Sequence, residues 1–269
     1  MMTKLVIVEG LPASGKSTAA RTIAKRLEMS GRKIFFVDEG TGDHPADYEF
    51  HAYVSDNQLS KMPKEDRETV KAVSVSRRGG FIVPLAAVDA GLREKLMPYK
   101  IYDGLPWEIE KPLMLEKWRE FADHAENEDA VYVFNCVLLQ NPMCETMMRF
   151  DLPLERSFEY IKSITERIVS LEPIVFYMKT DRIEGRILSV AKERGDWLDQ
   201  VIDYHANGGY GKRIGAKGLD GYIRCLRERQ KRELAVLQSL PIRSFVIENA
   251  AQDFGAAHEK MAEILDLNG

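Results

Sequence analysis

Cysteine is scarce in this chain, whose 269 residues include only three. They are Cys136, Cys144 and Cys225, an odd number without the spacing of a metal-ligand set. A disulfide framework of the kind that supports small secreted domains is therefore excluded. We expect reduced, partly buried thiols in a cytoplasmic protein.

Long hydrophobic runs and an excess of one charge sign are also missing. The first apolar run, Leu5–Val8, is too short for the apolar segment of a signal peptide or for a membrane span. The formal net charge is -4 and the isoelectric point is about 5.9, so no overall basic field attracts nucleic acid or anionic membranes. We therefore expect neither as a partner, and any anion-binding site must be local.

What the sequence does contain is the composition of a folded soluble protein, with 45% apolar and 30% charged residues. Its length is enough to bury one large α/β core, and nothing in it requires a second independent domain. We therefore expect residues 1–269 to form a single decorated domain.

The first forty residues follow the order strand, helix, strand that builds a parallel sheet. Lys4–Glu9 has the pattern of a buried strand, Lys16–Met29 carries apolar residues at helical spacing, and Ile34–Val37 is a second strand. Further strands are expected at 131–134, 174–178 and 245–247, and further helices at 111–125, from about 153 to 168, after 180, at 219–237 and from about 254. The sequence thus predicts a doubly wound α/β fold with a mostly parallel five-stranded sheet.

Two segments interrupt this plan. Residues 40–129 have the character of a helical insertion, with a polar helix at about 65–75 and an apolar run at 81–83. Residues 195–221 are rich in glycine, and we expect them to be mobile and to contribute to a lid at about 182–215. Asp181 and Glu184 have the spacing of a capping box at the start of the helix that leads into this lid.

The sharpest signal is the motif G-x-x-x-x-G-K-S between the first strand and the first helix. Backbone N–H groups of such a loop point at phosphate oxygens, and the start of the helix adds partial positive charge. Lys16 would reach the outer phosphates, and the Ser17 hydroxyl would coordinate Mg²⁺. The ligand that we expect is ATP with Mg²⁺, bound by Gly10, Pro12, Ala13, Ser14, Gly15, Lys16, Ser17 and Thr18.

In this motif, in its strand order and in an arginine-bearing helix before a glycine-rich segment, the chain resembles P-loop kinases. The group is that of the nucleoside and nucleoside-monophosphate kinases, and the chain most resembles its bacterial, thymidylate-kinase-like members without an obvious substrate. The resemblance covers a core of residues 3–39 and about 130–265, whereas residues 40–129 match no member of the group. It implies a doubly wound P-loop domain.

The resemblance also implies functional residues outside the loop. Glu39, with Asp38 beside it, occupies the position of the acid that takes the proton of the acceptor hydroxyl, although a solvated loop pair is the alternative. Arg182 and Arg186 resemble lid arginines that neutralise the transferring phosphoryl group, where the alternative is a solvated helix face. Other candidates for the lid are Arg194, Lys212 and Arg213, and the loop 249–254 is expected beside the adenine base.

The third core strand ends in Asn135, where many relatives place Asp or Glu. Because Asn supplies no charge, Mg²⁺ would depend on Ser17, on the phosphates and on Asp38 or Glu39, with Glu39 preferred. This departure keeps open a protein that binds ATP without turnover and senses or sequesters a ligand.

The acceptor is the least determined part. The residues that we expect to contact it are Asp38, Asp43, His44 and Tyr48. A metal site at His44, Asp47 and His51 is an alternative whose spacing is not diagnostic. The function that we expect is transfer of the ATP γ-phosphate to a small molecule, nucleoside-like or an antibiotic, whereas a GTPase is disfavoured because the guanine-reading N-K-x-D is missing. The oligomeric state is unknown from the sequence.

Overall fold

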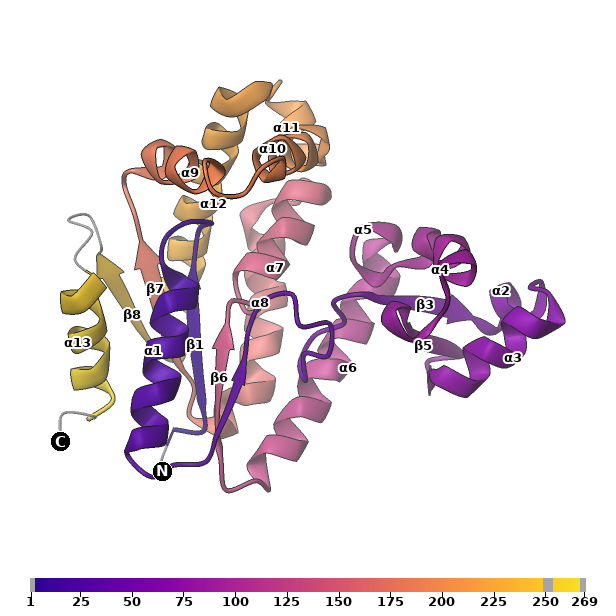
Figure 1. Cartoon of the computed structure of the whole chain (residues 1–269), viewed down its shortest axis with the longest axis horizontal. Helices are drawn as coiled ribbons and strands as arrows, with labels where there is room; N and C mark the ends of the chain where they lie inside the picture. The colour runs from indigo at the N-terminus through magenta and orange to yellow at the C-terminus, as the bar shows by residue number, and fades with distance from the viewer. Residues whose placement is uncertain (1–2, 249–253, 267–269) are drawn as a thin grey trace. The chain divides into compact units, whose positions relative to one another are not determined.

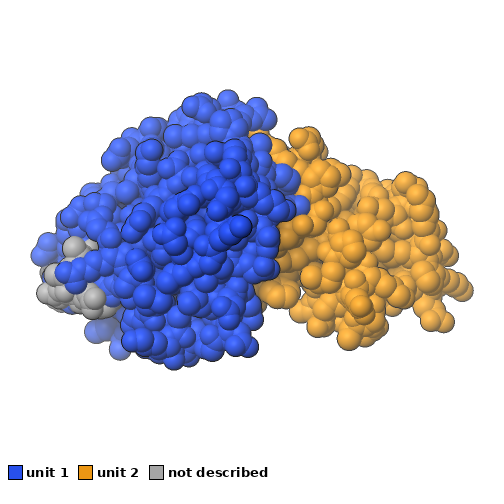
Figure 2. All heavy atoms as spheres, turned by 90° about the horizontal axis from the view of Figure 1, so that it is seen from above, with its two compact units in different colours: residues 1–39, 122–269 blue, residues 40–121 orange. Residues whose placement is uncertain are grey.

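The computed structural model describes residues 3–248 and 254–266. The chain divides into two compact units (Figure 2). Unit 1 comprises Met1–Glu39 and Ala122–Gly269, and unit 2 comprises Gly40–Phe121. The expected insertion, residues 40–129, thus overlaps unit 2.

The sheet of unit 1 has five parallel strands in the described part of the chain, in the order β2-β6-β1-β7-β8. They are β1 (Leu5–Gly10), β2 (Ile34–Val37), β6 (Val131–Asn135), β7 (Ile174–Lys179) and β8 (Arg243–Glu248). The strands β1, β6 and β7 are buried along almost their whole length, because a central parallel strand is covered on both faces. The five predicted strands are confirmed.

Helices cover both faces of this sheet. They are α1 (Lys16–Met29), α7 (Gln140–Met143), α8 (Leu154–Ile168), α9 (Ile183–Ala191), α10 (Trp197–Asn207), α11 (Gly209–Arg213), α12 (Gly218–Ser239) and α13 (Phe254–Ile264). The helices α1 and α13 pack on one face, where Val6 and Val8 join one apolar core with Ile23 and Met261. On the other face Tyr177 reaches Glu233 of α12, and α8 packs against α12 (Figure 1).

The loops that follow β1, β2 and β6 all leave the sheet at the carboxyl ends of the strands, and α9, α10 and α11 lie beyond the same edge (Figure 1). In open α/β sheets ligands bind at this edge. The strand order, the helices on both faces and the loop from β1 to α1 together make this a doubly wound P-loop NTPase fold.

The glycine-rich stretch is helical rather than irregular, since it forms α10, α11 and the start of α12. Its glycines allow close packing. A Cβ atom at Gly208 would collide with the Met148 carbonyl oxygen, and one at Gly211 would collide with the His205 carbonyl oxygen. The composition therefore reflects tight helix contacts, and the mobility of this stretch stays a prediction.

The predicted capping box at the start of α9 is also wrong. The residue that caps this helix is Arg182, which makes no side-chain capping bond within the described residues. Its backbone N–H donates to Thr180 Oγ1 at 3.3 Å, and Asp181 lies 3.7 Å from Lys179 Nζ instead. A nearby hydroxyl and a lysine thus replace the reciprocal bonds of the box.

Unit 2 contains a small antiparallel sheet of order β3-β5-β4. Its elements are β3 (His51–Ser55), β4 (Val75–Arg77), β5 (Gly80–Pro84), α2 (Asp56–Ser60), α3 (Lys64–Val73), α4 (Ala90–Leu96), α5 (Ile101–Gly104) and α6 (Trp107–Glu126), whose last turn belongs to unit 1. Ala52, Val54, Val70, Val83 and Leu92 pack into a core of its own. Only α3, α6 and the apolar run of β5 had a clear signal in the sequence.

Candidate functional site

The loop between β1 and α1 has a conformation that requires glycine at both ends. Gly10 has φ 147°, and a Cβ atom there would lie 2.7 Å from Ser14 Oγ and 2.8 Å from the Met178 carbonyl oxygen. Gly15 precedes the first turn of α1 with φ 92°. The chain therefore wraps tightly and exposes the N-terminal N–H groups of a 14-residue helix to an anion.

A cleft of about 650 Å³ opens beside this loop. It is lined by the loop and the start of α1, by Glu39 after β2, and by residues of α7, α9, α10 and α12. Among the predicted nucleotide-binding residues, Pro12, Ala13, Gly15, Lys16, Ser17 and Thr18 line this cleft, whereas Ser14 is buried and Gly10 ends β1.

Glu39 lies beside the lysine of the motif. Its Oε2 is 3.3 Å from Lys16 Nζ, and Oε1 accepts a hydrogen bond from Gln140 Nε2 at 2.6 Å. Burial acts to raise the pKa of Glu39, but Lys16, the Gln140 bond and the charge of Arg229 outweigh it and leave this pKa below its ordinary value. The side chain is therefore a carboxylate at neutral pH, within the cleft and next to the phosphate loop.

Asn135, at the end of β6, connects the Ser17 hydroxyl at the start of α1 with the Asp38 carboxylate that follows β2. Its Nδ2 donates to Ser17 Oγ at 2.9 Å and to Asp38 Oδ1 at 2.6 Å, and Arg21 forms an ion pair with the other oxygen of Asp38. Burial acts to raise the pKa of Asp38, but these two partners outweigh it and hold the pKa below its ordinary value. Asp38 is therefore a charged carboxylate that the Asn135 amide links to the Ser17 hydroxyl.

The oxygens around Asn135 fit a hard divalent cation such as Mg²⁺. The Ser17 hydroxyl and the Asp38 carboxylate both lie at the Asn135 amide nitrogen, and Asn135 Oδ1 is buried and accepts no hydrogen bond from any described residue. Such oxygens suit Mg²⁺ when phosphates and water complete its shell. No group of three or more His, Cys, Asp or Glu side chains in the described ranges could hold a metal by itself, so nucleotide phosphates would have to contribute.

The predicted lid arginines separate into two groups. Arg186 and Arg194 line the cleft, and the Arg194 guanidinium lies 5.4 Å from the ring centre of Trp197. Arg182 is exposed and does not contribute to the lining that the structure describes. Arg213 forms an ion pair with Asp151, so its charge is used within the protein.

Three of the predicted acceptor residues belong to unit 2 rather than to unit 1. Asp43 is exposed, whereas His44 and Tyr48 are buried. His44 Nδ1 accepts from the Ala46 N–H at 3.1 Å, and burial, with the charge of Lys117, lowers the pKa of His44 to about 3. His44 thus has the environment of a neutral residue that fixes a loop.

The structure adds polar residues beneath the cleft that sequence reasoning missed. Glu9 is fully buried on β1, and its carboxylate accepts from the N–H groups of Leu138, Leu139 and Gln140 at 2.7, 2.8 and 3.2 Å. An acid inside an apolar strand just before the motif is a signal that could have indicated it.

A second set lies on helices far along the chain. Arg229 forms a fully buried ion pair with Glu233 at 3.1 Å, and the Tyr177 hydroxyl donates to Glu233 at 2.5 Å. His205 and Tyr222 line the cleft together with Arg229. Four-residue spacing of Arg229 and Glu233 on an apolar helix face was the available sign of the pair.

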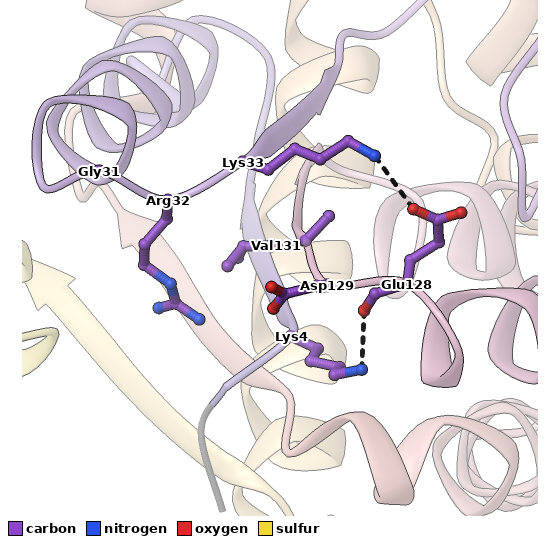
Figure 3. A pocket seen from close by; sticks show the side chains of 8 residues that line it. Lys4, Gly31, Arg32, Lys33, Glu128, Asp129 and Val131 are labelled. Atoms are coloured by element: carbon purple, nitrogen blue, oxygen red, sulfur yellow. Dashed lines mark hydrogen bonds and ion pairs between the residues drawn. The ribbon is translucent and has the colours of Figure 1, made fainter.

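A second hollow lies at the opposite end of the strands, where β1 and β6 begin (Figure 3). Its lysines are engaged by the protein itself. Lys4 Nζ donates to the carbonyl oxygens of Glu126 and Glu128 at 2.7 and 2.8 Å, and Lys33 pairs with Glu128 at 3.1 Å (Figure 3). These contacts hold the loop before β6 against β1 and β2, so the charges stabilise the fold.

The strand order, the glycine loop and the cleft define a nucleotide-binding protein of P-loop NTPase fold. The profile of a family described as chromatin associated protein KTI12 matches residues 2–78, a part of the chain that includes the loop. The comparison with curated proteins found no match.

Several solved structures are similar to this chain. Thymidylate kinase from Ehrlichia chaffeensis is 12% identical over 98% of this chain and 100% of its own, with a TM-score of 0.47. Thymidylate kinase from Candida albicans is 12% identical over 99% and 92%, with a TM-score of 0.42. YorR protein from Bacillus subtilis, in complex with phosphorylated GDP, is 14% identical over 98% and 96%, with a TM-score of 0.41. At these values the fold assignment rests on the strand order and the loop described above.

Proposed function

We propose that this protein transfers the γ-phosphate of ATP to a hydroxyl or phosphate group of a small molecule. The observation that carries the proposal is the position of the Glu39 carboxylate, 3.3 Å from Lys16 Nζ in a cleft that the phosphate loop lines. A phosphate-binding loop alone describes a nucleotide binder. A charged carboxylate beside it supplies a hydrogen-bond acceptor for the attacking group, which phosphoryl transfer needs more than a strong base.

In this proposal each group has one task. The N–H groups of the loop and Lys16 hold the β- and γ-phosphates, and Arg186 and Arg194 face the charge that develops on the transferring group. The acceptor oxygen bonds to the γ-phosphorus, the bond from this phosphorus to the ADP oxygen breaks, and the acceptor proton passes to Glu39. Mg²⁺ would neutralise phosphate charge and would be held by Ser17 and Asp38, with Asn135 between them.

The second candidate is a protein that binds ATP without turnover, which Asn135 favours because it replaces an acid at the end of β6. The arrangement around Asn135 weakens this candidate, since its amide holds the charged Asp38 beside Ser17.

The proposal further includes a cytoplasmic location. No helix in the described part of the chain has the length and apolar character needed to cross a bilayer.

Glu39→Gln separates the two candidates. Glutamine keeps the shape and the bond to Gln140 within reach but lacks the charge, so we expect transfer to fall about a hundredfold or more while ATP affinity changes little. The measurement is transfer of γ-labelled phosphate to nucleosides, nucleotides and aminoglycosides, screened first with the wild-type protein.

Glu248→Gln is a matched control, because Glu248 is an acid at the end of another strand of the same sheet, β8. It pairs with Lys179 at 3.1 Å but does not line the cleft that the structure describes. Its substitution should leave transfer unchanged. If wild type binds ATP tightly yet labels no acceptor, and Glu39→Gln binds ATP equally well, the protein is a binder rather than a kinase.

A further inference from the structure

Three polar side chains from two helices form a buried wall of the cleft. His205 comes from α10, and Tyr222 and Arg229 come from α12. Their exposed fractions are 5%, 0% and 1%, and all three line the cleft. Tyr222 and Arg229 are two helical turns apart, so they project from one face of α12, and the rings of Tyr222 and His205 lie 4.8 Å apart.

The hydrogen bonds of this wall are incomplete. Arg229 Nη1 donates to Cys144 Sγ at 3.4 Å, and Nε pairs with Glu233 at 3.1 Å. The Nε contact is an ion pair without the geometry of a hydrogen bond, and Arg229 Nη2 and the Tyr222 hydroxyl have no hydrogen-bond partner among residues 3–248 and 254–266. A buried donor left unpaired lowers the stability of the folded protein. Two of them on one wall of a cleft indicate groups that a ligand pairs.

His205 adds an acceptor to these donors. Its Nδ1 must donate to the Val201 carbonyl oxygen at 2.7 Å, because a carbonyl only accepts. Nε2 therefore carries the lone pair, and it too is unpaired within the described part of the protein. Burial, with the charge of Arg229, lowers the pKa of His205 to about 4, so the ring stays neutral at pH 7.

The charged side chain of the wall is Arg229, whose guanidinium forms an ion pair with Glu233. Burial acts to lower the pKa of Arg229, but Glu233, Cys144 and the tyrosines outweigh it and hold the guanidinium protonated. Burial raises the pKa of Tyr222 against the opposing charge of Arg229, so its hydroxyl keeps its proton and can donate. The wall thus presents one cationic donor, one neutral donor and one neutral acceptor.

We infer that His205, Tyr222 and Arg229 form a subsite for an anionic group of the acceptor. Arg229 Nη2 and the Tyr222 hydroxyl donate hydrogen bonds to a carboxylate or phosphate group, and His205 Nε2 accepts one from a neighbouring O–H or N–H group of the same molecule. The inference rests on the proposed function and adds the chemical class of the acceptor, which is a small anion that carries a neighbouring hydrogen-bond donor.

The test uses the full chain with its phosphate loop filled. The protein is saturated with magnesium and AMP-PNP, an ATP analogue that is not hydrolysed, and then titrated by calorimetry with inorganic phosphate and, separately, with lactate. The two probes distinguish a phosphate from a hydroxylated carboxylate. We expect at least one of them to bind, and Tyr222→Phe to weaken that binding about tenfold.

The stability and the probe binding of three variants exclude a merely structural role of Tyr222 and Arg229. Tyr222→Phe should unfold at the same or a higher temperature than wild type, because its hydroxyl has no partner to lose among the described residues. Tyr177→Phe loses the bond to Glu233, so it should lower stability without weakening the probe. Arg229→Lys keeps a charge opposite Glu233 but lacks Nη2, and it should also weaken the probe.

The outcomes separate this inference from the proposed function. If AMP-PNP itself does not bind to wild type, the proposed function fails. If the nucleotide binds but neither probe does, or if Tyr222→Phe and Arg229→Lys bind the probe as well as wild type, the subsite is wrong and the nucleotide site stands.

Discussion

Asn135 and Asp38 differ in what they contribute to this site. An acid at the end of β6 would supply both charge and position, whereas here Asp38 supplies the charge and the Asn135 amide fixes it beside Ser17. An amide that donates to both groups holds them together. The end of β2 therefore supplies the carboxylate that the end of β6 lacks.

Glu9 makes the folded state sensitive to pH. Burial is the largest influence on the pKa of Glu9. With the charge of Glu233 it raises this pKa from 4.5 to about 7, although three backbone hydrogen bonds act to lower it. A carboxyl group with a raised pKa binds its proton more tightly when folded than when unfolded. The contribution of Glu9 to the free energy of unfolding is therefore greatest below pH 4.5. It falls between pH 4.5 and 7 and stays at its lowest value above pH 7.

Glu9→Gln should remove this dependence, because glutamine does not titrate. The shift corresponds to on the order of 3 kcal/mol, so the difference in unfolding free energy between wild type and variant should change by that amount across the window. Urea denaturation of both proteins from pH 4.5 to 8 measures it, and titrations shared by the two proteins cancel. A difference that stays constant with pH would mean that Glu9 is ionised throughout.

Arg182 caps α9 and Arg186 lies one turn further along this helix, and the structure places only Arg186 in the cleft. We expect Arg186→Ala to reduce phosphoryl transfer about ten- to a hundredfold with a smaller effect on ATP affinity, because the charge that it meets grows during transfer. Arg182→Ala is the matched control and should act within about twofold of wild type. Steady-state kinetics with a confirmed acceptor decide between them, and equal effects of the two substitutions would contradict the lid assignment.

Elements with a strong apolar period could be predicted from the sequence. The helix Lys16–Met29 and the strand Ile34–Val37 have the predicted bounds, because their apolar spacing leaves no alternative. The segment 195–221 could not, because glycine signals backbone freedom in a sequence but here serves close helix packing. The short strand β4 is exposed along most of its length, so it has no buried face to produce a pattern.

The site shows the same division between local and distant residues. The loop, Asp38 and Glu39 could be located because strand ends in a parallel sheet meet at one edge. Arg229, Tyr222 and His205 could not, because they come from helices in which a buried polar residue looks like one turned to solvent. Their convergence on the cleft is a property of the folded chain.

The two units have separate apolar cores, so the whole molecule offers two reporters of ligand binding. The nucleotide cleft is built from unit 1 alone. A ligand that binds there should stabilise the core of unit 1, by about 2.7 kcal/mol when its concentration is a hundred times the dissociation constant.

Calorimetric unfolding with and without magnesium and AMP-PNP tests the nucleotide site most directly, in wild type, Lys16→Ala and the control Lys179→Ala. Lys179 pairs with Glu248 as Lys16 pairs with Glu39, but it does not line the cleft that the structure describes. The nucleotide should raise the unfolding temperature of wild type and of Lys179→Ala, and it should leave that of a folded Lys16→Ala unchanged. An equal rise in all three proteins would contradict phosphate binding by this loop.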